Sequence, residues 1–235
     1  MTTRKRVAIL ISGRGSNMAA LIAAARERDY PAEIVQVISS RADAPGLDIA
    51  AQARVPTHTV PKADHPTPVS YDAAIDAALR DAGVEIVCLA GYMRRLSAEF
   101  VARWQGRLIN IHPSLLPMLP GLHAHRRALE AGLKIHGCTV HFVTEELDAG
   151  PIIAQAAVPV ELDDTEERLS QRVLKAEHRL YPIALGMVAE DKVRMEGGRA
   201  IFSTFAVKGG PGELIISPEP VSTVSDLESL ARFTP

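Results

Sequence analysis

Cysteine is scarce in this chain, which contains only Cys88 and Cys138 in 235 residues. Both lie within apolar segments and lack the spacing of metal ligands, so we expect two buried free thiols, as in a reducing cytoplasm. No apolar run is as long as a membrane span or forms an adequate signal peptide. These absences predict a cytoplasmic protein with no membrane partner and no cysteine-based metal site.

The sequence also lacks an excess of either charge. Lys and Arg total 26, Asp and Glu total 28, and the formal net charge is -2. Proteins that bind nucleic acids or membrane surfaces usually carry a basic face, so we expect neither partner. Hydrophobic residues make up 47% of the chain, and 235 residues are enough for one large domain with a substantial core.

What the chain does contain is an alternation of short apolar runs and amphipathic segments. Residues 7–11 are apolar and too few for a helix, so they are expected to form a buried strand. Similar patterns predict strands at 33–39, 57–60, 84–90, 108–111, 134–143 and 151–157, and helices at 18–28, 46–53, 71–82, 98–104 and 165–190. This order predicts an α/β fold with a doubly wound, mostly parallel sheet and a Rossmann-like N-terminal half.

The composition changes near residue 203. Residues 192–195 and 200–202 predict a hairpin, and the segments beyond it are rich in glycine and proline, as at 209–212 and 217–220. We therefore expect one domain over residues 1–202 and a C-terminal extension over residues 203–235 that lies on the surface or moves freely. No role for the extension follows from its sequence.

Polar residues interrupt the apolar strand at 108–111. Asn110 and His112 are two positions apart, so they point to the same side near the end of the strand, where open α/β sheets bind ligands. Pro113 then ends the strand. An amide and an imidazole at this place could hold a carbonyl oxygen on which negative charge develops. From the residue types alone, a hydrogen-bonded structural histidine is the alternative.

A glycine-rich turn follows the first strand. Gly13 and Gly15 allow close approach of the backbone, and Ser16 and Asn17 precede the predicted helix. Backbone N–H groups at such a helix N-terminus face an anion. The turn is not a dinucleotide fingerprint, because Met18 replaces the third glycine, and it is not a P-loop, which needs Gly-Lys-Ser/Thr. A phosphate site and a plain turn both remain open.

Two segments together resemble a known family. They are Asn110-x-His112-Pro113-Ser114-Leu115-Leu116-Pro117 with Gly121, and Glu146-Leu147-Asp148-x-Gly150-Pro151. This combination resembles the folate-dependent formyltransferases, and within them the enzymes that formylate glycinamide ribonucleotide, over most of residues 7–200. The resemblance implies that residues 1–202 form a formyltransferase catalytic domain. The implied reaction moves the formyl group of 10-formyltetrahydrofolate to the amine of glycinamide ribonucleotide, in purine biosynthesis.

The resemblance also implies roles for individual residues. Asn110, His112 and Asp148 are implied to be catalytic, the Asp148 carboxylate favouring a protonated His112 imidazole. The residues implied to bind glycinamide ribonucleotide are Gly13, Gly15, Ser16, Asn17, Arg107 and Glu177. Those implied to bind the folate are Met93, Arg94, Arg95, Leu96, Asn110, Thr144, Glu145, Glu146 and Leu147. No metal is expected, because His123 and His125 lack further ligands in the sequence around them.

The sequence leaves other interpretations open. Residues 93–96 could be a simple connector, residues 145–150 a solvated turn, and Arg107 part of a structural ion pair. Formyltetrahydrofolate deformylases and methionyl-tRNA formyltransferases resemble the same Asn, His and Asp set, although residues 203–235 are too few and not basic enough for a tRNA-binding domain. A phosphate-binding module without catalysis would explain the glycine turn alone. The sequence fits a monomer or a homodimer.

Overall fold

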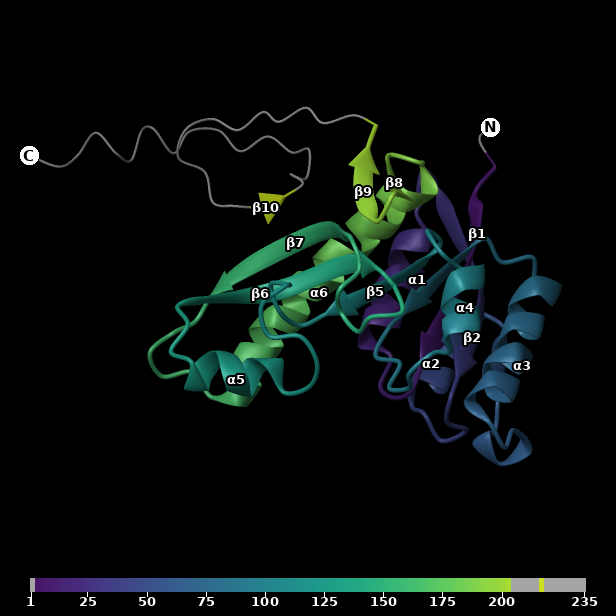
Figure 1. The fold of residues 1–235 in the computed structure, drawn as a ribbon, viewed down its shortest axis with the longest axis horizontal. Helices are drawn as coiled ribbons and strands as arrows, with labels where there is room; N and C mark the ends of the chain where they lie inside the picture. Colours follow the sequence, from purple (N-terminus) through teal and green to yellow (C-terminus); the bar gives the residue numbers. More distant parts are fainter. Residues whose placement is uncertain (1–2, 204–215, 218–235) are drawn as a thin grey trace, which may run out of the picture.

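The computed structural model describes residues 3–203 and 216–217. The main sheet contains β1 (Lys5–Ile11), β2 (Ala32–Ser39), β3 (Thr57–Thr59), β4 (Ile86–Leu89), β5 (Leu108–His112), β6 (Ile135–Phe142), β7 (Ile152–Pro159) and β10 (Ile216–Ser217). The helices are α1 (Ser16–Ala25), α2 (Gly46–Gln52), α3 (Pro68–Asp81), α4 (Ala98–Arg103), α5 (Ala124–Glu130) and α6 (Glu166–Ala189). A separate hairpin consists of β8 (Val193–Glu196) and β9 (Arg199–Phe202), as predicted (Figure 1).

The main sheet has two halves with different strand directions. In one half the order is β3-β2-β1-β4-β5, and all neighbouring strands are parallel. In the other half β6, β7 and β10 follow β5, each antiparallel to its neighbour. Figure 1 shows β6 and β7 extending away from the parallel half. The predicted α/β fold, with a mostly parallel sheet and a Rossmann-like N-terminal half, is confirmed.

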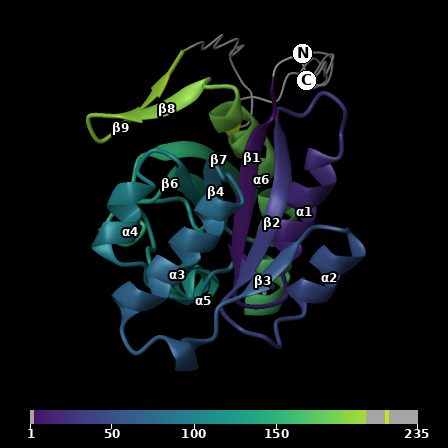
Figure 2. The ribbon, with the colours of Figure 1, turned by 90° about the vertical axis from the view of Figure 1, so that its right-hand side faces the viewer.

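Helices cover both faces of the parallel half (Figure 2). On one face Ile9 and Ile109 belong to a core cluster with residues of α1, α2, α5 and α6. The neighbouring positions Leu10 and Leu108 face the other way and pack with residues of α3 and α4. Because successive side chains of a strand point to opposite faces, a strand buried on both faces must be apolar throughout. This explains the uninterrupted apolar run at 7–11.

Helix α6 is fixed to the sheet close to the polar end of β5. Thr165 caps the helix by accepting from the Arg168 backbone N–H, and the helix continues through Pro182. Tyr181 is fully buried, and its hydroxyl lies 2.9 Å from the carbonyl oxygen of Leu89 and 3.2 Å from that of Ile109. These carbonyls belong to β4 and β5, so one hydroxyl fixes α6 to two adjacent strands.

The helix predicted at 71–82 begins earlier, at Pro68. Thr67 caps it by accepting from the Ser70 backbone N–H, and the Ser70 hydroxyl lies 3.3 Å from the Thr67 backbone nitrogen. Proline suits the first helical position, where no intrahelical N–H bond is lost. The predicted start at residue 71 was wrong, because it took no account of this capping box.

Most of the expected C-terminal extension lies outside the described residues. Within residues 203–235 the structure describes Ser203 and the two residues of β10, which pair with Ala156 and Gln155 of β7. In the part of the chain that the structure describes, no helix is both long enough and apolar enough to cross a membrane. That residues 203–235 form an extension separate from the domain therefore stays a proposal.

Two glycines on different elements should respond to alanine in opposite directions. A Cβ on Gly137 would lie 2.0 Å from the Ala156 carbonyl oxygen, whereas a Cβ on Gly186 would meet the Tyr30 ring at 3.7 Å. We expect Gly137→Ala to lower the free energy of unfolding by about 2 kcal/mol or more, because backbone atoms must move. Gly186→Ala should raise it by about 0.5 to 1 kcal/mol, because alanine favours a helix. Urea unfolding measures both, and equal effects would contradict this account of the two positions.

Candidate active site

The carboxyl ends of β1, β4 and β5 lie side by side at one edge of the sheet. Leu10 pairs with Leu89, and Leu89 pairs with Asn110, so the three strands are in register there. The glycine turn directly follows β1, and His112 ends β5. Two strand spacings, about 10 Å, separate β1 from β5. The turn and the polar end of β5 therefore lie at the edge where open α/β sheets bind ligands.

Asn110 is oriented by a histidine of the neighbouring antiparallel strand. Asn110 pairs with His141 across β5 and β6, and its Nδ2 lies 3.2 Å from His141 Nε2. His141 Nδ1 donates to the Phe142 carbonyl oxygen at 2.9 Å. Burial lowers the pKa of His141. The hydrogen bond to the Phe142 carbonyl and the charge of Asp148 raise this pKa, but they only partly offset the effect of burial. A neutral His141 thus accepts one amide hydrogen of Asn110, and the second amide hydrogen remains for a ligand.

His112 lies between two oxygen acceptors. Its Nδ1 is 3.3 Å from an oxygen of Asp148, and its Nε2 is 3.1 Å from the carbonyl oxygen of Leu119. The side chains of His112 and Asp148 are 8% and 6% exposed, so water does not replace these contacts. Both contacts are hydrogen bonds only when each ring nitrogen carries a proton. The structure brings His112 and Asp148 together, as expected from the sequence.

The loop before β7 holds the Asp148 carboxylate in place. Its Oδ2 accepts from the Gly121 backbone N–H at 2.8 Å, and its Oδ1 lies 3.8 Å from His141 Nε2. Asp148 has a positive φ of 54°, a conformation that aspartate tolerates better than most residues. Two residues later, a Cβ on Gly150 would lie 1.7 Å from the Phe142 carbonyl oxygen, so only glycine fits there. The tight turn thereby fixes Asp148 between two histidines.

Two polar residues that sequence reasoning missed hold the loop after His112. Thr139 donates to the carbonyl oxygen of Ser114 at 2.7 Å and accepts from the Leu116 backbone N–H at 3.0 Å. Gln155 Nε2 lies 2.9 Å from the carbonyl oxygen of Leu116. His112, Thr139 and Gln155 are consecutive partners across β5, β6 and β7. The period-2 spacing of Thr139 and His141 was a signal that could have identified the first of them.

The glycine turn begins α1 without a side-chain cap. Gly15 precedes the helix with a φ of 72°, and no acidic residue lies in the first helical turn. Asn17 Nδ2 donates to the carboxylate of Glu177 on α6 at 2.7 Å. Burial raises the pKa of Glu177, and the hydrogen bond from Asn17 acts in the opposite direction. The structure thus joins Asn17 and Glu177, and no side chain among the described residues caps the first N–H groups of α1.

The residues expected to bind folate lie on β5, which contains Asn110, and on the loops that follow β4 and β6. Met93, on the loop after β4, donates its backbone N–H to Ser12 Oγ at 2.9 Å and has a side chain that is 74% exposed. The Arg94 guanidinium stacks 3.9 Å from the centre of the Tyr71 ring. The remaining residues divide into Arg95, Glu145, Glu146 and Leu147, which are exposed, and Leu96 and Thr144, which are half-buried. Their binding role stays a prediction.

Arg107 lies at the opposite end of β5 from His112, and its substrate-binding role stays a prediction. It precedes the first residue of β5, whereas His112 is the last, so the two are about 16 Å apart along the strand. Its guanidinium stacks 4.7 Å from the Trp104 ring centre and donates to the Arg103 carbonyl oxygen. Arg107 therefore enters the sheet at the edge opposite the glycine turn.

Comparison with known proteins places the chain in a family. Residues 5–185 match the family model described as formyl transferase. The chain belongs to the formyl transferase family. Phosphoribosylglycinamide formyltransferase of Escherichia coli (strain K12) is 44% identical over 194 residues, which cover 83% of this chain and 92% of that protein. The human trifunctional purine biosynthetic protein adenosine-3 is 50% identical over 197 residues, which cover 83% of this chain and 20% of that protein. The chain thus spans about a fifth of this trifunctional relative.

Solved structures agree with this family assignment. The phosphoribosylglycinamide formyltransferase of Brucella melitensis has 57% identity and a TM-score of 0.77, covering 80% of this chain and 96% of that chain. A formyltetrahydrofolate deformylase of Pseudomonas syringae pv. tomato has 28% identity and a TM-score of 0.78, covering 85% of this chain and 66% of that chain. The formyl transferases therefore share this fold with a deformylase.

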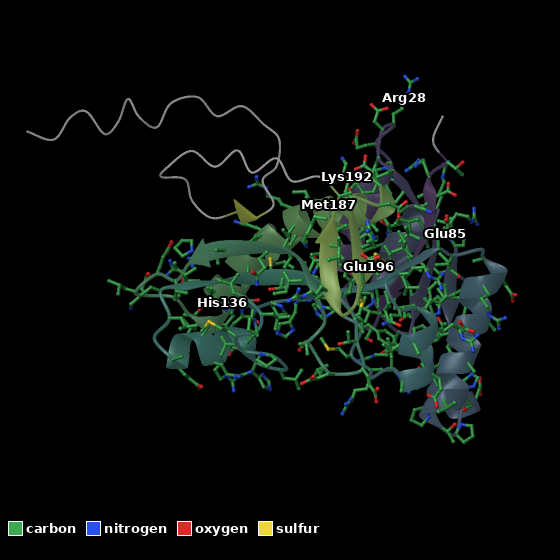
Figure 3. The ribbon with its side chains drawn as sticks, turned by 45° about the horizontal axis from the view of Figure 1, so that its top comes forward. Arg28, Glu85, His136, Met187, Lys192 and Glu196 are labelled. Atoms are coloured by element: carbon green, nitrogen blue, oxygen red, sulfur yellow. The ribbon has the colours of Figure 1, made fainter. Side chains whose placement is uncertain are left out.

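A second pair of histidines lies beside the site. His136, a residue of β6 that is labelled in Figure 3, is 1% exposed, and its ring centre is 5.4 Å from that of His125. Burial, the neighbouring His125 and, more weakly, His112 lower the pKa of His136 to about 4, although a hydrogen bond to the Pro113 backbone opposes them. Residues 3–203 and 216–217 contain no group of three or more metal-ligating side chains that could hold a metal ion. A neutral His136 therefore supports the backbone that follows His112.

His136 should make the fold sensitive to acid. Its pKa is about 4 when folded, against an ordinary value of 6.5, so the unfolded chain binds the proton first as the pH falls. The contribution of His136 to the free energy of unfolding is fully present above pH 6.5. It is lost as the pH falls from 6.5 to about 4, by an amount on the order of 3 kcal/mol. We expect His136→Gln to reduce this loss in urea unfolding at pH 8, 6 and 4.5, each compared with wild type. The same pH dependence in both proteins would contradict this role.

Proposed function

We propose that this chain transfers the formyl group of 10-formyltetrahydrofolate to the amine of glycinamide ribonucleotide, giving formylglycinamide ribonucleotide and tetrahydrofolate. The relative with 92% of its length covered is named for this reaction type, as a phosphoribosylglycinamide formyltransferase. The single observation that carries the proposal is the convergence of Asn110, His112 and Asp148, with His112 Nδ1 3.3 Å from the Asp148 carboxylate. This group lies at the same sheet edge as an uncapped helix N-terminus.

The proposed chemistry is direct attack by the substrate amine on the formyl carbon, which the folate supplies. Asn110 donates its free amide hydrogen to the formyl oxygen, on which negative charge develops. Its second amide hydrogen is donated to His141. His112, protonated on both nitrogens, places positive charge beside that oxygen. Asp148 balances this charge and assists proton movement from the amine through water. The tetrahedral adduct then collapses as the bond between the formyl carbon and N10 of the folate breaks, and N10 takes up the proton lost by the amine. Tetrahydrofolate leaves, and no covalent intermediate with the enzyme forms.

The two substrates are proposed to enter from different loops. Gly13, Gly15, Ser16 and Asn17 bind the phosphoribosyl part, because free backbone N–H groups at a helix N-terminus attract phosphate. Glu177 contacts the same substrate through its carboxylate beside Asn17.

The folate is proposed to lie against the loops at 93–96 and 144–147. Met93 and Leu147 expose large apolar surfaces, at 74% and 59%, which suit flat aromatic rings. Arg94 and Arg95 suit the carboxylates of the folate tail. The proposed sites do not include Arg107, whose guanidinium stacks on Trp104 at the opposite end of β5 from His112.

An absorbance assay for tetrahydrofolate release distinguishes the candidate functions. We expect release from 10-formyltetrahydrofolate only when glycinamide ribonucleotide is present, with one formylated product per tetrahydrofolate. Release without the amine would indicate a deformylase, the activity named for the relative with 28% identity. No release under either condition would favour a binding module. Mass spectrometry of the ribonucleotide confirms where the formyl group goes.

Replacing Asp148 should impair turnover more than folding. In Asp148→Asn the amide keeps a similar shape and can still accept from Gly121, but the negative charge beside His112 is lost. We expect kcat to fall by about 100-fold, the usual scale for one acid–base or oxyanion element. Asp29→Asn, at an exposed site, is the matched control and should retain full activity. Near-normal turnover of Asp148→Asn, with intact folding by circular dichroism, would reject the role.

A further inference from the structure

The proposed phosphate site contains one cation whose function is unassigned. We propose that Arg14 binds the phosphate of the ribonucleotide substrate, together with the N-terminus of α1. The proposal rests on the function proposed above, because it assumes that the substrate carries a phosphate. It replaces Arg107, which lies at the other edge of the sheet and stacks on Trp104. Arg14 is instead the central residue of the glycine turn, between Gly13 and Gly15.

The backbone on both sides of Arg14 is held in place. The Gly13 carbonyl oxygen accepts from the Gly46 backbone N–H at 3.0 Å. A Cβ on Gly15 would lie 2.9 Å from the Met18 side chain and 3.0 Å from Gly46 Cα, so glycine is needed for this close packing. Gly15 also has a positive φ of 72°. The turn is therefore packed against α2, and Arg14 projects from a fixed position next to the first residues of α1.

The Arg14 side chain is free to bind a ligand. It is exposed, and it makes no hydrogen bond or ion pair with any residue in the described ranges 3–203 and 216–217. Arg41 also lies near the turn, because the preceding residue, Ser40, contacts Ser12. Arg41 donates two hydrogen bonds to the Asp43 carboxylate, at 2.9 and 2.6 Å. Near the turn, Arg41 is already paired, whereas Arg14 has all five N–H donors available.

A cation at this place also answers an electrostatic difficulty. Glu177 accepts from Asn17 at 2.7 Å, so a carboxyl group lies beside the turn. When ionised, this group repels a phosphate, and the N-terminus of a helix contributes only about half a positive charge. A guanidinium can contact two phosphate oxygens at once. Arg14 would thus supply the charge that the turn's backbone lacks, and this explains arginine between two glycines in the turn.

The experiment compares Arg14→Asn with wild type in steady-state kinetics of formyl transfer. We expect the KM for glycinamide ribonucleotide to rise about tenfold, the loss expected for one charge-assisted hydrogen bond. The kcat and the KM for 10-formyltetrahydrofolate should stay within about twofold, because Arg14 is proposed to contact only the phosphate. The inhibition constant of inorganic phosphate, competing with the ribonucleotide, should rise with the KM. Arg14→Lys should recover part of the loss.

Arg28→Asn is the matched control, since it removes the same charge just beyond the other end of α1. Arg28 is exposed, forms no hydrogen bond or ion pair with another described residue, and lies at the upper edge of the molecule in Figure 3. Its KM and phosphate inhibition should equal those of wild type. Equal KM values for Arg14→Asn and wild type, or equal increases in both variants, would overturn the proposal.

The outcomes also separate this proposal from the proposed function. If wild type forms no formylated ribonucleotide, the proposed function fails before any variant is compared. If wild type is active and Arg14→Asn has an unchanged KM and an unchanged phosphate inhibition constant, only the role of Arg14 fails. A lower kcat with an unchanged KM would also contradict phosphate binding, because it would indicate a disturbed turn instead.

Discussion

The candidate site depends on one buried carboxylate and the groups that surround it. The Asp148 side chain is 6% exposed and lies within 3.8 Å of His112, His141 and the Gly121 backbone N–H. A carboxyl group that is removed from water is unfavourable unless hydrogen bonds replace the lost solvation. The three partners come from β5, β6 and the loop after Pro120, so satisfying Asp148 requires that all three elements meet. The carboxylate thereby couples the geometry of the site to the stability of the fold.

The reversal of strand direction after β5 makes this arrangement possible. Because β6 runs antiparallel to β5, Asn110 faces His141 and His112 faces Thr139 across adjacent strands. Asn110 and His112 alternate with residues of the main core, so they lie on the face away from α6. The loop after β5 then folds back over this polar row, held by hydrogen bonds to Thr139 and Gln155. A parallel β6 would need a crossover helix and would give a different pairing.

Much of the fold follows from local sequence patterns, because buried strands and amphipathic helices have distinct periods. The strand at 7–11, the long helix predicted at 165–190 and the terminal hairpin were all predictable in this way. The start of α3 at Pro68 was missed because the capping box depends on Thr67 and Ser70 side chains, which local patterns indicate only weakly. Within the site, the contact between His112 and Asp148 was expected from the family resemblance and is present.

The edge of the sheet at which Arg107 lies does not follow from its residue type. Residue type suggests that an arginine can bind phosphate, but only strand direction tells at which edge it lies. Thr139 and Gln155 were missed because their importance arises from pairing between strands, which a single sequence does not specify.

The two halves of the sheet provide different parts of the proposed reaction. The parallel half ends in an uncapped helix, which attracts an anion, and the antiparallel half orders the amide, imidazole and carboxylate. Hydrolysis of a formyl group needs only the second set, since water carries no phosphate. Transfer to a phosphorylated amine needs both sets, at a separation of about 10 Å that matches two strand spacings. The proposed transfer therefore depends on how firmly the glycine turn holds the acceptor, because a held amine reacts in place of water.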